Sequence, residues 1–151
     1  MSGSSLISNS SSPFVSWKVE HAAIRVPDLD IAVAWYSEKL DFRLLRSWQL
    51  PGKKVGWISP IANDEFIFEL IAGPGADDRP VYEDLSSSYK VSGWHHTAFQ
   101  VESVDDTVVE LKRRGVTIVS EPHDLAEIRS RAAFFRDLWG NLVEVMQVIS
   151  I

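Results

Sequence analysis

The chain has 151 residues, which is enough for one domain or for two small modules that share a core. Apolar residues make up 45% of it and charged residues 24%, as is typical of a soluble globular protein. The net charge of -6 argues against nucleic-acid binding, which needs clustered Lys and Arg. Cysteine is absent, so disulfides and thiolate chemistry are excluded, and a bound metal would need nitrogen and oxygen ligands.

The chain begins with a serine-rich stretch, residues 1–16, that has neither a basic start nor a continuous apolar core. We predict a disordered leader rather than a signal peptide. No apolar stretch is long enough to cross a bilayer, so we expect no membrane partner and a cytoplasmic location.

Residues 17–72 form the first predicted module. An alternating apolar run over 19–26 predicts a strand, and Asp28 or Asp30 is suited to cap the helix that follows. Three more short strands are expected, at 42–49, 54–59 and 65–72. Residues 73–92 are rich in Pro, Gly, Asp and Ser, and we predict that they link this module to the next.

Residues 93–151 form a second predicted module with the same plan. A strand is expected over 94–101, and then a helix capped by Ser103 or Asp105 and ended by Gly115. Three strands complete it, at 117–121, 129–136 and 142–148.

The two modules are copies of one another. A shift of 75 positions places His21 over His96 and Glu69 over Glu144 without a gap, so in both copies the Glu follows the His by 48 positions. A lone β-α-β-β-β unit leaves one apolar sheet face uncovered, which a second copy can bury. We predict an α+β fold in which two tandem βαβββ modules form a curved mixed sheet that encloses a cleft.

The repeated His and Glu residues are candidates for metal ligands. A single strand His is most often a hydrogen-bonded core or surface residue, and a single Glu can face solvent. Here both copies keep both residues, and each Glu stands between apolar neighbours with no Lys or Arg close in sequence. An internal carboxylate needs a cation. We therefore predict that one divalent ion binds to His21, Glu69, His96 and Glu144. Ni, Co, Zn, Mn and Fe are all compatible with these ligands.

Other polar residues lie close to these positions. His95 precedes the ligand His96, and alternation along a strand predicts that it faces the helix and has a structural role. Arg25 and Gln100 occupy equivalent positions on the strand face of the ligand histidines, where Trp94 also lies. These three are our candidates for contacting a polar or anionic small-molecule substrate. For Arg25 and Gln100 a simple hydrogen-bonding role in the core stays open.

Three segments of the chain resemble the vicinal oxygen chelate superfamily. They are VEHAAIRVPDLDIAVAWYSEKLDFRLLR, GWHHTAFQVESVDDTVVELKRRG and FFRDLWGNLVEVMQ. This superfamily includes glyoxalase I, methylmalonyl-CoA epimerase, extradiol dioxygenases and the fosfomycin and bleomycin resistance proteins. The resemblance covers residues 17–147. It implies that the four metal positions of the family fall on the predicted ligands, and that the chain forms a homodimer.

A complete His/Glu/His/Glu set looks most like the lyase and isomerase branch of the family. The resemblance implies an enzyme in which a bound divalent ion stabilises an enediolate of a small oxygenated substrate, with Glu144 or Glu69 as the base. One alternative is a bleomycin-resistance-like protein that sequesters an aromatic compound. Its cleft would be lined by tryptophans, at positions 48, 57, 94 and 139, although core packing is the favoured role for at least two of them. A lesser alternative is an Fe(II) extradiol-type dioxygenase.

Overall fold

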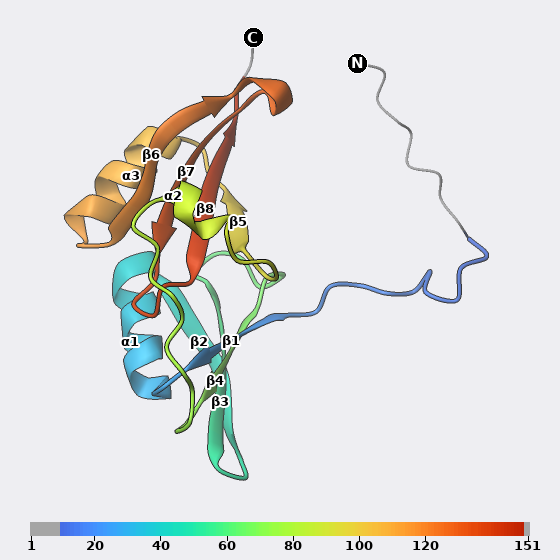
Figure 1. The fold of residues 1–151 in the computed structure, drawn as a ribbon. Coiled ribbons are helices and arrows are strands. Elements are labelled where there is room, and N and C mark those ends of the chain that lie inside the picture. The colour runs from blue at the N-terminus through green and yellow to red at the C-terminus, as the bar shows by residue number, and fades with distance from the viewer. Residues whose placement is uncertain (1–9, 150–151) are drawn as a thin grey trace.

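The computed structural model describes residues 10–149 and contains two modules joined by a linker (Figure 1). Residues 1–9 of the predicted leader lie outside this range. The first module consists of β1 (Ala22–Val26), α1 (Leu29–Leu40), β2 (Phe42–Leu50), β3 (Lys53–Pro60) and β4 (Phe68–Ala72). The second consists of β5 (His96–Gln100), α3 (Val104–Arg113), β6 (Thr117–Leu125), a 3-10 turn (Ala126–Ile128), β7 (Ser130–Arg136) and β8 (Leu142–Val148). The predicted βαβββ plan is confirmed in both copies.

Each module forms a four-stranded sheet of its own. The strand orders are β1-β4-β3-β2 and β5-β8-β7-β6, so β1 and β5 occupy equivalent edges. The β1–β4 and β5–β8 pairs are parallel and the other pairs are antiparallel. The sequence pattern predicted one curved sheet, whereas the described strands pair within their modules only. Alternation of side chains does not reveal which edges pair, because it is the same for an edge strand and an inner strand.

The helices begin where short polar side chains cap them. The Asp28 carboxylate accepts a hydrogen bond from the Ile31 amide at 2.9 Å, and the Ser103 hydroxyl accepts one from the Asp106 amide at 3.2 Å. Helix α1 covers one face of the first sheet and α3 one face of the second, which leaves the other face of each sheet for a site (Figure 1). No helix within residues 10–149 has the length and apolar character that crossing a bilayer requires.

Aromatic contacts, a buried hydrogen bond and an exposed ion pair join the two modules. Phe99 of β5 packs against the first core, where its ring lies 5.1 Å from that of Phe66 and 6.0 Å from that of Phe42. The Tyr36 hydroxyl of α1 donates to the Asp137 carboxylate, between β7 and β8, at 2.8 Å. Arg114 pairs with Asp41 at 2.9 Å and holds the pKa of that carboxyl below its ordinary value. These contacts hold the two modules together.

The linker contains a short helix that the composition did not indicate. This helix, α2 (Leu85–Ser88), is drawn in front of the second sheet in Figure 1, and its last residue, Ser88, lies next to His95, just before β5. It begins with a capping box, in which the Asp84 carboxylate accepts from the Ser87 amide at 2.7 Å. A single turn bounded by polar residues has too few apolar positions to show helical periodicity. The sequence pattern therefore does not predict this helix.

Candidate metal centre

The second module places His96 and Glu144 side by side. Glu144 lies between Val143 and Val145, which belong to the core under α3, so strand alternation directs its carboxylate to the opposite face of the sheet. His96 is the first residue of β5, the neighbour of β8 in the sheet. Its Nε2 lies 3.1 Å from Glu144 Oε2. The carboxylate is almost completely buried, since only 6% of the residue is exposed.

The first module repeats this pair more openly. Glu69 lies between Phe68 and Leu70 of the first core and therefore also points away from its helix. His21 stands immediately before β1, and its Nε2 lies 3.9 Å from Glu69 Oε2. The same carboxylate oxygen accepts a hydrogen bond from Trp57 Nε1 at 2.8 Å.

The donor set fits a divalent ion. Two ligand atoms that bind one ion at about 2.0–2.2 Å and at right angles lie about 3 Å apart, which is the separation of the His96 and Glu144 atoms. Among the described residues, neither Glu69 nor Glu144 forms an ion pair with Lys or Arg. A buried carboxylate without a cationic partner is costly, and a metal ion supplies that partner.

The four predicted ligands come together as two pairs within one chain. Among residues 10–149, no three His, Asp or Glu side chains stand close enough to hold a single ion. The proposed four-ligand centre thus needs a further approach of the two pairs, by a change within the chain or by a second copy.

The three predicted substrate contacts have different surroundings. The Arg25 guanidinium donates to four backbone carbonyls at 2.6–2.9 Å, those of Val26, Ile71, Gly73 and Pro74. It therefore holds the start of the linker against β1 and β4. Gln100 is exposed on β5, and Trp94 is 67% exposed just before that strand. The proposal that these residues contact substrate stays a prediction.

The predicted direction of the His95 side chain is wrong, whereas its structural role stays a prediction. Its Nδ1 lies 2.7 Å from the Nδ1 of His96, and its ring stacks on Tyr89 of the linker rather than facing α3. The reason is that β5 starts only at His96, so strand alternation does not determine the direction of the preceding side chain.

Two tryptophans and an arginine gather beside Glu69. The sequence indicated the tryptophans as candidates but not the arginine. The rings of Trp48 and Trp57 meet edge to face at 5.5 Å, and the guanidinium of Arg46 lies 5.0 and 5.1 Å from their centres. We call these three residues the aromatic wall. Strand pairing places them together, because Arg46 lies opposite Trp57 and Trp48 opposite Val55 across β2 and β3.

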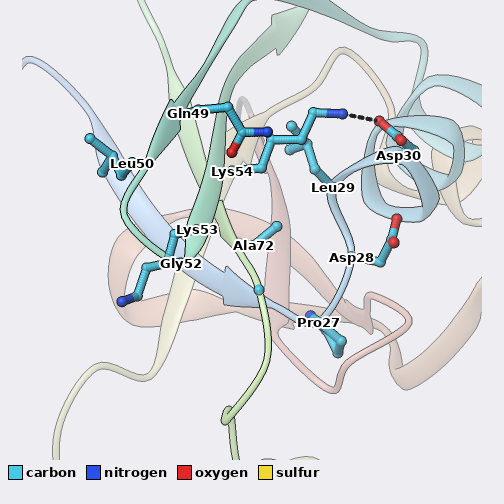
Figure 2. Close-up of a pocket in the computed structure, with 11 residues that line it drawn as sticks. Pro27, Asp28, Leu29, Asp30, Gln49, Leu50, Gly52, Lys53, Lys54 and Ala72 are labelled. Carbon is cyan, nitrogen blue, oxygen red and sulfur yellow. Dashed lines mark hydrogen bonds and ion pairs between the residues drawn. The ribbon is translucent and has the colours of Figure 1, made fainter.

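A hollow at the far end of the first module is shown in Figure 2. It lies between the start of α1 and the turn that joins β2 to β3, and Lys54 donates to Asp30 at its rim at 2.8 Å. None of the predicted ligands or substrate contacts lines this hollow, and it gives no candidate site.

Comparisons with known proteins show the family to which this fold belongs. The family model described as Glyoxalase/Bleomycin resistance protein/Dioxygenase superfamily matches residues 18–145. The uncharacterized protein YraH of Bacillus subtilis (strain 168) is 41% identical over 80% of this chain and 82% of its own length. Human mitochondrial methylmalonyl-CoA epimerase is 29% identical over 86% of this chain and 73% of its own length. The crystal structure of glyoxalase I from Zea mays, 25% identical, matches 87% of this chain and 44% of that chain with a TM-score of 0.68. The chain belongs to the glyoxalase/bleomycin resistance protein/dioxygenase superfamily.

Proposed function

We propose that this protein is a metal-dependent lyase or isomerase that moves a proton on a small oxygenated substrate. The observation that carries the proposal is the duplicated His/Glu pair, with a buried carboxylate that has an imidazole as its only ionic partner among the described residues. The similarity to an epimerase and to glyoxalase I supports the same class of reaction. The four ligands would be His21, Glu69, His96 and Glu144.

Glu144 is the residue best suited to accept the proton. A bound divalent ion would supply Lewis-acid stabilisation to a substrate oxygen that gains negative charge. The Glu144 carboxylate is shielded from water and receives no hydrogen bond from an amide, hydroxyl or indole among the described residues. Glu69, by contrast, already accepts a hydrogen bond from Trp57 on Oε2. Glu144 would take the proton from carbon and return it to the neighbouring atom.

The complete centre would form between two copies of the chain. In a symmetric dimer, His21 and Glu69 of one copy meet His96 and Glu144 of the other, and the twofold axis generates two such sites. Exposed apolar residues next to the histidines support this arrangement. Trp17 is 76% and Val19 92% exposed before His21, and Trp94 is 67% exposed before His96. A second copy would remove this apolar surface from water.

The substrate would lie against the aromatic wall. Arg46 is exposed, so its guanidinium is available to a carboxylate or phosphate, while the indole rings of Trp48 and Trp57 offer an apolar surface. The Trp57 indole also contacts Glu69 directly, which places this surface beside one pair of ligands. An anionic, partly apolar small molecule fits these groups.

Metal content tests the proposal. Protein purified without a chelator is expected to contain about one divalent ion per chain, since a symmetric dimer holds two sites. The His96→Ala variant is expected to lose this ion while keeping its fold, as followed by circular dichroism. His123→Ala is the matched control, because His123 lies on β6 and hydrogen-bonds to the Glu121 carbonyl. Wild-type protein that takes up no divalent ion would contradict the proposal.

The same measurement separates the alternatives. The aromatic wall is also suited to a protein that sequesters an aromatic compound, and that function predicts ligand binding without metal. A dioxygenase would contain iron and consume O₂ with its substrate.

A further inference from the structure

A chain of hydrogen bonds runs from the linker helix to the metal-ligand candidate His96. The Ser88 hydroxyl lies 2.6 Å from the Leu85 carbonyl and 2.8 Å from His95 Nε2. His95 Nδ1 in turn lies 2.7 Å from His96 Nδ1, and His96 Nε2 faces Glu144 at 3.1 Å. Ser88 is fully buried. We call Ser88, His95 and His96 the relay.

Donor and acceptor capacity sets the direction of the relay when both imidazoles are neutral. The Leu85 carbonyl can only accept, so the Ser88 hydroxyl donates to it and accepts from His95 Nε2–H. A neutral imidazole carries one N–H, so His95 Nδ1 is an acceptor and His96 must donate its Nδ1–H. The lone pair of His96 is then on Nε2, the atom that faces Glu144.

We propose that His95 and Ser88 are positioning residues that hold His96 in the tautomer whose Nε2 is free to bind a metal ion. This inference rests on the proposed function. Metal-bound histidines commonly donate their second ring N–H to a protein acceptor, which fixes both the tautomer and the ring plane. In the opposite tautomer, an Nε2–H of His96 would donate to Glu144 and would compete with the ion for both ligands.

Two further observations support this role. The rings of Tyr89 and His95 stack with centres 5.2 Å apart and planes 9° apart, so the plane of the acceptor ring is fixed. The first module uses its equivalent position in the same way, because Glu20, which the repeat aligns with His95, contacts Nδ1 of His21. In both modules the residue before the ligand histidine therefore contacts the ring nitrogen that would not bind metal.

The linker helix α2 is consequently part of the surroundings of the candidate metal centre. Ser88 is the last residue of α2, and the capping box of Asp84 and Ser87 sets the start of that turn. The linker supplies the terminal acceptor of the relay, in addition to joining the modules.

Three variants test the relay. His95→Phe keeps an aromatic ring against Tyr89 but removes both nitrogens, and Ser88→Ala removes only the terminal hydroxyl. Ser86→Ala is the matched control, because it changes an exposed serine of the same helix that belongs neither to the capping box nor to the relay. The first readout is the tautomer of His96 in metal-free protein, from the imidazole ¹⁵N chemical shifts at a pH about one unit above the ordinary histidine pKa. The second is Zn²⁺ affinity, by competition with a chelator.

Wild type and Ser86→Ala are expected to carry the proton of His96 on Nδ1. His95→Phe is expected to move it towards Nε2 and to weaken Zn²⁺ binding by roughly 10–100-fold. Ser88→Ala should act in the same direction with a smaller effect. An Nε2–H tautomer in wild type, or a His95→Phe variant with unchanged tautomer and affinity, would overturn the positioning role. If His95→Phe does not fold, the tautomer of His96 in the Ser88→Ala variant decides, and an unchanged tautomer there overturns the positioning role.

The two readouts also separate this inference from the proposed function. The tautomer is measured without metal, so it tests the relay directly. A wild-type protein that binds no Zn²⁺ contradicts the proposed function, whatever its tautomer.

Discussion

Replacing Glu144 with Gln is expected to lower the rate of proton transfer by roughly 10²–10⁴-fold, the usual contribution of a general base. The amide has almost the same shape as the carboxylate but cannot accept a proton from carbon. It keeps a carbonyl oxygen, so part of the metal affinity should remain. The measurement is incorporation of solvent deuterium into a small oxygenated compound that the wild-type protein is first shown to exchange, together with the metal content of the same sample.

Glu69→Gln is the matched control for this prediction. Glu69 occupies the equivalent position in the repeat, but its Oε2 already accepts a hydrogen bond from Trp57. We therefore expect a smaller loss of exchange rate from Glu69→Gln than from Glu144→Gln. The assignment of the base is wrong if Glu144→Gln exchanges deuterium as fast as wild type, or if Glu69→Gln is the slower variant.

Replacing Asp137 with Ala is expected to lower the free energy of unfolding by about 3–5 kcal/mol, because it removes the shared acceptor of a buried network. Asp137 is buried, with 2% of the residue exposed. It accepts hydrogen bonds from the Tyr36 hydroxyl at 2.8 Å, from the amides of Trp139 and Asn141 at 2.9 and 2.8 Å, and from the Asn141 side chain at 2.7 Å. Alanine would remove the partner of the buried Tyr36 hydroxyl and of three partly buried donors.

Thermal unfolding measures this effect, and a loss of that size corresponds to a fall in Tm of roughly 10 °C for a chain of this length. Tyr36→Phe is the milder companion variant, since it removes one donor and leaves the other three. Burial, reinforced by the nearby Asp137 charge, raises the pKa of Tyr36 well above its ordinary value, so the hydroxyl stays a donor at any working pH. A Tm of Asp137→Ala equal to that of wild type would contradict this account of how the modules are joined.

The sequence contains enough information to predict the two modules and the ligand pairs. The repeat aligns His21 with His96 and Glu69 with Glu144, and strand alternation places each Glu opposite its helix. These features are local, or are duplicated at a fixed spacing, which makes them visible in one chain. The caps Asp28 and Ser103 were among the predicted choices for the same reason.

The arrangement around the pairs was not predictable in the same way. The linker turn at Ser88 and the direction of His95 depend on where β5 begins and on contacts between segments that have no periodic pattern. The four hydrogen bonds of Arg25 arise because its strand ends beside the start of the linker, which alternation does not encode. Whether the two ligand pairs meet depends on the packing of whole modules, which a residue pattern does not fix.

Mixing two defective chains tests directly whether each metal centre is shared between copies. One chain would carry His21→Ala and Glu69→Ala, and the other His96→Ala and Glu144→Ala. Each alone is expected to bind no ion, because both of its sites lack one pair. A mixed dimer, however, regains one intact site, so random pairing should restore metal to roughly a quarter of the sites. If mixed dimers form but bind no ion, the two pairs do not meet across an interface, and a shared centre is contradicted.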